Sequence, residues 1–233
     1  MLMSSEPSFQ QRIRSFIRRQ GRLTTAQQFA LDNLWDTYCL KPDVTYDYQQ
    51  VFGRTAPMIV EIGFGNGESL VDMAKNNPDK NYLGIEVHRP GVGHLMMLLH
   101  QQQINNVRIY CHDAIEILEN KIVDHSLAGV HLFFPDPWPK KKHHKRRIVR
   151  SSFVHLLTKK LVQGGYFHTA TDWQNYAENM LLILNAEPSL MNSSSTGDYC
   201  ERPESRPLTK FEQRGLRLGH GVWDLHFTNN VGN

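Results

Sequence analysis

Several features that mark extracellular and membrane proteins are missing from this 233-residue sequence. It has only three cysteines, Cys39, Cys111 and Cys200, and their spacing suggests no pairing, which is typical of free thiols in a reducing compartment. Its apolar runs are too short for a transmembrane helix, which needs about 20 residues. The arginine-rich N-terminal residues are not followed by a long apolar stretch, so we predict no secretory signal and a cytoplasmic location.

A strong net charge is also missing, because the formal charge is only +3. The distribution of charge is nevertheless uneven. Residues 12–22 hold five arginines, residues 140–150 hold four lysines and three arginines, and neither stretch contains an acid, which leaves −9 on the rest of the chain. An acidic body with two basic patches is typical of a protein that binds a polyanion. The alternative for either stretch alone is a plain solvated surface.

The chain is long for one domain and short for two. We expect a basic, flexible segment at residues 1–20 and a single domain at residues 21–233. From residue 57 onward, apolar runs alternate with helical periodicity, which predicts an α/β fold with a mostly parallel sheet and helices on both faces. Strands are expected at residues 57–64, 81–87, 107–113, 127–136, 165–172 and 222–227. Helices are expected at residues 24–38, 67–77, 91–103, 114–120, 148–161, 173–184 and 209–218, with a loop at 191–207.

The first expected strand ends in a glycine-rich loop, Glu61-Ile-Gly63-Phe-Gly65-Asn-Gly67-Glu68. Glycines in this position let the backbone pass close to a ligand. A dinucleotide-binding loop has its third glycine three residues after the second, where this sequence has Glu68. A carboxylate there would repel a pyrophosphate, so we expect a ligand that carries positive charge. S-adenosylmethionine fits, because it has a sulfonium, an ammonium and no phosphate.

The second and third strands also end in acids. Glu86 is placed to accept hydrogen bonds from both hydroxyls of a ribose, and Asp113 is placed to receive an adenine amino group. Taken singly, each acid is also compatible with a solvated strand end, and the glycine loop with a plain turn. Three acids at the carboxyl ends of three successive strands, together with the glycines, resemble the class I S-adenosylmethionine-dependent methyltransferases. That resemblance implies a Rossmann-like fold with seven strands and an antiparallel last strand.

The fourth strand leads into Asp136-Pro-Trp138-Pro and then directly into the basic run that begins at Lys140. Asp136 is expected beside the donor methyl group, and the cations are expected to hold a negatively charged acceptor. Guanine N7 already has an exposed lone pair, so a carboxylate would need only to orient the base and stabilise its developing positive charge. An exocyclic amine acceptor would instead suggest the pattern D/N-P-P-Y/F. Trp138 is either a stacking residue or a packed one.

Five longer motifs resemble one family, the bacterial tRNA (guanine-N7-)-methyltransferases. They are VEIGFGNGES, GIEVHRPGVG, FFPDPWPKKKHHKRR, TATDWQNYAENM and TKFEQRGLRLGHGVWDL, which span residues 59–225 in the order of the family. The runs DPWPKK, HHKRR and TKFE are specific to this family, whereas the glycine loop is not. The resemblance implies transfer of a methyl group from S-adenosylmethionine to N7 of the variable-loop guanosine in tRNA.

The resemblance also implies roles for individual residues. S-adenosylmethionine would be bound by Glu61, Gly63, Gly65, Gly67, Glu86, Asp113 and Asp136, and Asp136 would also act catalytically. The guanosine would be bound by Lys140, Asp172, Thr209, Lys210, Phe211 and Glu212. The RNA backbone would be contacted by Lys142, Lys145, Arg146 and Arg147. No metal ion and no obligatory protein partner are implied, and both a monomer and a homodimer stay open.

Two of these roles have structural alternatives. Asp172 follows the fifth strand and can accept two N–H bonds from guanine, but it is also a candidate N-cap for the next helix. Thr209 and Glu212 have the spacing of a capping box. Two other functions also stay open, a methyltransferase that acts on another RNA base or on a small acidic molecule, and a non-catalytic RNA-binding protein. The three strand-end acids argue against the second.

Overall fold

The computed structural model describes residues 13–17, 21–204, 206–208, 212–213, 219 and 221–230. The strands of this part are β1 Met58–Ile62, β2 Asn81–Ile85, β3 Val107–Tyr110, β4 Leu127–Phe133, β5 Leu161–Thr171, β6 Leu190–Asn192 and β7 Trp223–Asn229. Its helices are α1 Thr25–Asn33, α2 Trp35–Tyr38, α3 Tyr48–Phe52, α4 Glu68–Asn76, α5 Arg89–Gln101, α6 Ala114–Lys121, α7 Ser151–Lys160 and α8 Gln174–Asn185, and a short 3₁₀ helix, η1, spans Lys141–Arg146.

The seven strands form one sheet in the order β3-β2-β1-β4-β5-β7-β6. Strands β1 to β5 run parallel, whereas β7 is antiparallel to both β5 and β6. Every residue of β1 and β2 is buried, as expected for strands whose two faces are both covered. The predicted α/β fold, with a mostly parallel seven-stranded sheet and an antiparallel last strand, is confirmed.

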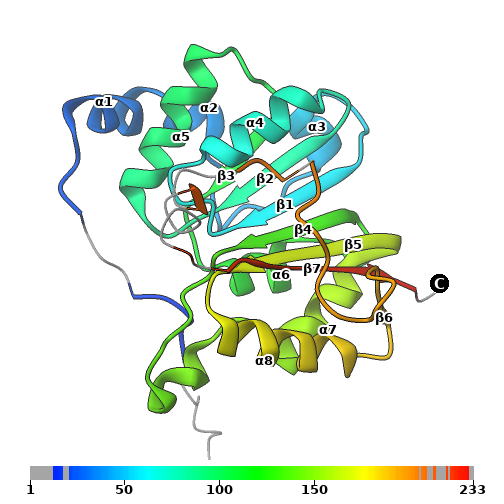
Figure 1. The fold of residues 1–233 in the computed structure, drawn as a ribbon. Coiled ribbons are helices and arrows are strands. Elements are labelled where there is room, and N and C mark those ends of the chain that lie inside the picture. Colours follow the sequence, from blue (N-terminus) through cyan, green and yellow to red (C-terminus); the bar gives the residue numbers. More distant parts are fainter. Residues whose placement is uncertain are drawn as a thin grey trace, which may run out of the picture.

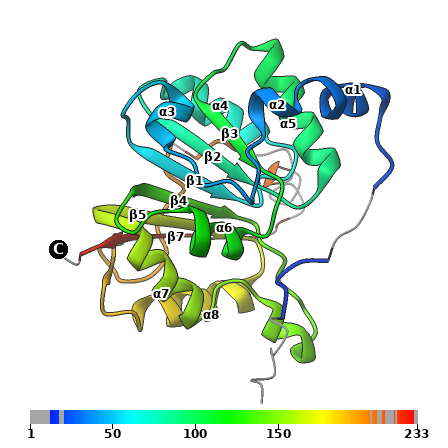
Figure 2. The ribbon, with the colours of Figure 1, turned by 180° about the vertical axis from the view of Figure 1, so that it is seen from behind.

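Helices cover both faces of this sheet (Figure 1) and the same layers are seen from behind (Figure 2). On one face, α6, α7 and α8 enclose a core that includes Val130, Leu157 and Met180, and α3 packs at its margin. On the other face, α1, α2, α4 and α5 enclose a second core that includes Leu70 and Leu95. The sheet therefore separates two apolar layers, and its strand ends are left to form a site.

The boundary between α7 and β5 differs from the sequence prediction. The helix ends at Lys160, whereas the glycine pair Gly164-Gly165 suggested that helix extended to residue 161 and that the strand began at 165. Instead, Gly164 has a φ of 74°, and the pairing of β4 with β5 shifts between Leu127 and Gly129. The glycines therefore mark an irregularity inside a long strand rather than the end of a helix.

Three short elements have no counterpart in the prediction, and one of them is η1. Helix α3 was not predicted, and β6 lies across the start of the predicted loop at 191–207. Three-residue and five-residue elements carry too little periodicity to be recognised in a sequence. Most of the predicted helix at 209–218 lies outside the described residues, although residues 212 and 213 are helical.

Cys39, Cys111 and Cys200 are free thiols, as their spacing predicted. Burial raises the pKa of the Cys39 thiol, so this group stays protonated and packs as a small apolar side chain. No helix among the described residues combines the length and the apolar content that a membrane crossing requires.

Helix α5 passes very close to the glycine loop after β1. A Cβ atom on Gly91 would lie 2.1 Å from the carbonyl oxygen of Gly65, so only glycine fits in this first turn. This close contact fixes the loop against the helix that follows β2.

Gly91→Ala tests this contact. Because the loop or the helix must shift to admit a methyl group, we expect the free energy of unfolding to fall by about 1–3 kcal/mol. Urea denaturation measures the change. His100→Ala, at an exposed position near the end of the same helix, is the control and should stay within about 0.5 kcal/mol. Equal stability of the two variants would contradict the contact.

Candidate functional site

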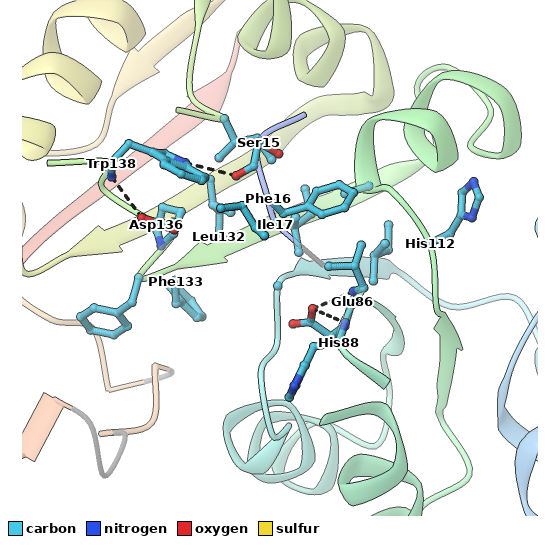
Figure 3. Close-up of a pocket in the computed structure, with 18 residues that line it drawn as sticks. Ser15, Phe16, Ile17, Glu86, His88, His112, Leu132, Phe133, Asp136 and Trp138 are labelled. Carbon is cyan, nitrogen blue, oxygen red and sulfur yellow. Dashed lines mark hydrogen bonds between the residues drawn. The ribbon is translucent and has the colours of Figure 1, made fainter. Parts of the chain in front are cut away.

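A cavity of about 450 Å³ lies where the carboxyl ends of β1, β2, β3 and β4 meet. Ligands of open α/β sheets bind at this edge, and the volume is that of a small-molecule site. Figure 3 shows Glu86, His112 and Asp136 around it, each on the connection that follows a different strand. Because the strands are parallel, residues that are far apart in the sequence come together here.

The glycine loop borders this cavity. Gly63, Gly65 and Gly67 have φ values of 72°, 61° and 85°, in the left-handed region that favours glycine. A Cβ atom on Gly63 or Gly65 would meet nothing within 4 Å, whereas one on Gly67 would lie 2.7 Å from the side chain of Leu95. The first two glycines therefore leave open space for a ligand, and the third is required by packing.

Glu86 is held by three backbone N–H groups. Its Oε1 accepts hydrogen bonds from Val87 and His88 at 2.6 and 2.9 Å, and its Oε2 accepts one from Gly65 at 3.1 Å. These bonds tie the end of β2 to the glycine loop and fix the carboxylate at the wall of the cavity. Each carboxylate oxygen has about two acceptor positions, so Oε2 can still accept a hydroxyl group.

Glu61 lies at the end of β1 with 3% of its surface exposed. Its Oε2 is buried and has no hydrogen-bond partner among the described residues. Burial, together with the nearby charge of Glu86, raises the pKa of Glu61 to about 8. A buried carboxyl group without a partner is costly, so its presence beside this edge points to a ligand that donates to it, such as an ammonium group.

Asp113 is placed differently from the other two strand-end acids. Its Oδ1 accepts from the backbone N–H of Ile115 at 2.9 Å, so it caps helix α6, and it is 4% exposed. Its neighbours His112 and Ala114 line the cavity instead. A contact between Asp113 and an adenine stays a prediction, and the cap is its structural role.

The Asp136 segment has a strained backbone. Phe134 and Trp138 have φ values of 51° and 47°, which bulky residues rarely adopt. The backbone N–H of Trp138 donates to Oδ1 of Asp136 at 3.1 Å, which orients this exposed carboxylate at the cavity. Strain of this kind persists where surrounding contacts impose it, and it is frequent at functional sites.

Trp138 is the packed residue rather than the stacking one. It is 6% exposed, and its Nε1 donates to the carbonyl oxygen of Ser15 at 3.2 Å. The Arg146 guanidinium lies 5.0 Å from the centroid of the Trp138 ring. Trp138 therefore forms a wall of the cavity and joins the basic run to it.

Ser15, Phe16 and Ile17 also line the cavity, which the sequence prediction did not include. Figure 3 shows Phe16 and Ile17 lying between the Asp136 side and the Glu86 side. The only sequence signal was the pair of apolar residues within an arginine-rich stretch. The division into a flexible segment at 1–20 and a domain at 21–233 stays a prediction.

The basic run forms η1 and the residues beside it. Lys140, Lys142 and Lys145 are exposed, and Arg146 is partly covered by its contact with Trp138. In Figure 1, this green segment projects from the sheet edge near the start of α8. Its contacts with RNA stay a prediction, which the exposure of the three lysines favours.

Arg147 differs from the other residues predicted to contact the RNA backbone, because its side chain is buried. It is 3% exposed, and it donates to the carbonyl oxygen of Pro137 and to Oδ1 of Asn175, both at 2.9 Å. Its guanidinium lies 4.6 Å from the ring centroid of Tyr176. This side chain supports the Asp136 segment from inside the protein, and it also lines a hollow beside α8. Its contact with the RNA backbone stays a prediction.

Asp172 lies at the same sheet edge, after β5, and is partly exposed. The alternative role as N-cap of α8 is wrong, because Trp173 holds that position without a side-chain cap. The backbone N–H of Trp173 donates instead to Oγ1 of Thr171 at 3.2 Å. Asp172 therefore does not cap α8, and capping does not account for an aspartate at this position.

Glu212 belongs to a buried ionic network. Both of its oxygens accept from the Arg206 guanidinium, at 2.6 and 2.7 Å, and it is 3% exposed. Arg206 also donates to both oxygens of Asp224, at 2.7 and 2.8 Å, and His168 hydrogen-bonds the same carboxylate at 2.7 Å. Burial alone would raise the pKa of Asp224, but the hydrogen bonds from His168 and Arg206 lower it.

This network changes the interpretation of Glu212. Its carboxylate is committed to Arg206, so it acts as a support rather than as an exposed substrate ligand. The Arg206 guanidinium also lies 5.8 and 5.6 Å from the rings of Phe133 and Phe134, which lead to Asp136. No sequence pattern pointed to Arg206, apart from its position six residues before Glu212. Thr209, Lys210 and Phe211 lie outside the described residues.

Comparison with known proteins defines the family. A family model described as "Putative methyltransferase" matches residues 55–225. A tRNA (guanine-N(7)-)-methyltransferase of Histophilus somni (strain 129Pt) is 55% identical over 96% of this chain and 89% of its own length. One of Pseudoalteromonas atlantica is 58% identical over 93% of this chain and 91% of its own length. The chain belongs to the tRNA (guanine-N(7)-)-methyltransferase family.

Solved structures support the fold of this methyltransferase family. The 16S rRNA methyltransferase KamB has a TM-score of 0.59 and covers 81% of this chain and 96% of its own, with 14% identity. The cyclase SpnF has a TM-score of 0.54 and covers 93% of this chain and 100% of its own, with 13% identity. Because a cyclase shares the fold, the architecture alone does not decide the reaction.

Within the described residues of this family member, no three His, Cys, Asp or Glu side chains are grouped so that they could hold a metal ion. His94 Nδ1 hydrogen-bonds the carbonyl oxygen of Asn66 at 2.8 Å, which again ties α5 to the glycine loop.

Glu61→Gln tests the burial of an unpaired carboxyl group. The pKa of Glu61 is raised from 4.5 to about 8 in the folded protein, so the folded state loses stability as pH rises through this range. Glutamine carries no such charge, so we expect the variant to be about 3–5 kcal/mol more stable than the wild type at pH 8. The gain should shrink towards zero near pH 5. Urea denaturation at both pH values measures it, and a gain of equal size at both would contradict this cause.

Arg206→Lys and Glu212→Gln test the ionic network. Each removes a bidentate contact in a buried position, so each should lower the free energy of unfolding by about 2–4 kcal/mol. The double variant should lose less than the sum, because both changes remove the same interaction. Glu204→Gln, at an exposed acid of the same segment, is the control. Strictly additive losses would show that the two side chains do not depend on each other.

Proposed function

We propose that this protein transfers a methyl group from S-adenosylmethionine to N7 of the variable-loop guanosine in tRNA. The observation that carries the proposal is the Asp136 segment. It presents an oriented, exposed carboxylate at a small-molecule cavity and continues directly into the exposed lysines of η1. Its relatives in the family carry the name of this reaction.

The residues that line the cavity, together with Glu61 at the adjoining end of β1, fit S-adenosylmethionine. The unpartnered oxygen of Glu61 suits an ammonium group, the remaining acceptor position of Glu86 suits a ribose hydroxyl, and the open space beside Gly63 admits a ligand close to the backbone. When bound, S-adenosylmethionine supplies an electrophilic methyl group on its sulfonium. The absence of a cationic side chain among the residues that line the cavity favours a positively charged ligand, within the part that the structure describes.

The acceptor side requires orientation rather than proton removal. Guanine N7 has an in-plane lone pair, and positive charge develops on the base as it is methylated. Asp136 is held by the Trp138 N–H, so its negative charge is fixed near the cavity without an entropic cost at the moment of reaction. Asp172 is proposed to accept guanine N–H groups from the neighbouring strand end, and Lys140 to bind the RNA beside them.

The RNA backbone is proposed to lie along Lys142 and Lys145, with Arg146 nearby. Thr209, Lys210 and Phe211 are proposed to complete the guanosine site. We propose a cytoplasmic protein whose partner is tRNA. The free thiols support this location.

The function is tested by methyl transfer from labelled S-adenosylmethionine to unfractionated tRNA. After reduction, aniline cleaves RNA chains at N7-methylguanosine, so cleavage confined to the variable loop is the expected result. Incorporation of label without this cleavage would move the reaction to another atom. Binding of tRNA without incorporation would point to a non-catalytic protein.

Asp136→Ala and Asp136→Asn test the role of the carboxylate. Both should lower kcat by about 100-fold or more, because both remove the negative charge that faces the base. Asparagine retains the oxygen that accepts from the Trp138 N–H, so Asp136→Asn should bind tRNA as the wild type does. Single-turnover kinetics and filter binding separate the two effects. If methyl transfer and tRNA binding fell equally in Asp136→Asn, Asp136 would be a binding residue only.

A further inference from the structure

A second hollow, of about 720 Å³, lies between η1 and α8. Its lining includes the apolar residues Val149 and Ile183 and the polar residues Lys141, Arg147, Arg150 and Asn179. No acid lines it among the described residues. It begins where the guanosine site is proposed to end, because Trp173 at its margin directly follows Asp172. We call it the η1–α8 groove.

Trp173, which lines this groove, is unusually exposed for a tryptophan. Its side chain is 40% exposed, whereas Trp138 is 6% exposed, and the two other tryptophans are covered to an intermediate degree. A large aromatic ring left in water beside basic residues is typical of a surface on which a nucleic acid base stacks. In Figure 1, the start of α8 faces the projecting green η1 segment, which agrees with the residues that line the groove.

Two buried polar atoms of the groove residues lack a hydrogen-bond partner among the described residues. They are Nε of Arg150 and Nε2 of His144. One terminal nitrogen of Arg150 donates to the carbonyl oxygen of Lys145 at 3.3 Å, which is a long bond for a charged donor. The Arg150 Nε–H is an unsatisfied donor, and His144 Nε2 is a second one in the tautomer that protonates it. Beside the exposed Lys141, they suit an acceptor with several oxygens and a negative charge, such as a phosphate group.

The groove is also rigid on its inner side. Arg147, which lines the groove, is fixed between Pro137, Asn175 and Tyr176, so this part of the lining does not need to order when a ligand enters. This support runs directly to the Asp136 segment through the Pro137 carbonyl. A nucleotide bound here would therefore be held at a constant position relative to Asp136.

We propose that the η1–α8 groove binds a nucleotide next to the target guanosine of tRNA. Its base stacks on Trp173, and its phosphate is held by Lys141 and Arg150. Bases in RNA loops are unstacked and can be read in this way, whereas paired bases cannot. This inference rests on the proposed function, since it extends the same RNA surface beyond the methylation site.

Trp173→Ala is the main test. Loss of one stacked base should weaken the binding of tRNA by about 5- to 100-fold at constant salt. Trp173→Phe keeps an aromatic face and should recover most of the affinity. The affinity for S-adenosylmethionine, measured by calorimetry on each full-length variant, should not change. Leu182→Ala is the matched control, because Leu182 is an exposed apolar residue of α8 that lies outside the groove.

The salt dependence separates stacking from phosphate binding. Trp173→Ala should leave the slope of log Kd against log salt concentration unchanged, because the ring carries no charge. Lys141→Gln and Arg150→Gln should each reduce that slope by about 0.7–0.9, because each removes one phosphate contact. The different effects on the salt slope distinguish the stacking of the base from the binding of the phosphate.

Wild-type-like binding of tRNA by Trp173→Ala would overturn the inference. So would a change of oligomeric state in Trp173→Ala, measured by sedimentation, since the ring would then belong to a protein interface. Failure of the proposed function is recognised separately, because the wild type itself would then not methylate tRNA. If the wild type methylates tRNA but Trp173→Ala binds tRNA as tightly as Leu182→Ala does, the proposal for the groove is wrong and the proposed function still holds.

Discussion

The meeting of four parallel strand ends at one edge is the constraint on which the rest of the structure depends. Parallel pairing fixes Glu61 beside Gly84, and the same register brings Glu86, His112 and Asp136 around one cavity. Antiparallel strands would send alternate ends to opposite sides. Burial of both sheet faces then leaves this edge as the natural place for a ligand.

The segment around Asp136 at this edge has a strained backbone, and two buried arginines stabilise it. Arg147 holds the Pro137 carbonyl, and Arg206 packs on Phe133 and Phe134 while it pairs with Glu212 and Asp224. Between them lies a segment with a left-handed backbone at two bulky residues. These contacts hold Asp136 in one orientation. They also explain why two charged residues that resemble RNA ligands in the sequence, Arg147 and Glu212, are turned inward.

Electrostatics divides the surface of this edge into two regions. The cavity is lined by acids and lacks lysine or arginine side chains among its described residues, which suits a cationic ligand. The adjoining η1 segment is strongly basic, which suits RNA. Trp138 is the boundary, because it lines the cavity and also contacts the Arg146 guanidinium. A positive ligand and a polyanion are thereby held side by side.

The sequence by itself determined the alternating elements, the mostly parallel sheet and the position of Asp136 after β4. These follow from apolar periodicity and from motifs of consecutive residues, which tertiary contacts do not alter. Only the tertiary structure decided which charged side chains are exposed. Arg146 and Arg147 are adjacent in one basic run, yet one lies on the Trp138 ring and the other is buried against Tyr176. Likewise, the pairing of Arg206 with Asp224 and the approach of Phe16 to the cavity join distant segments, and no local pattern encodes such contacts.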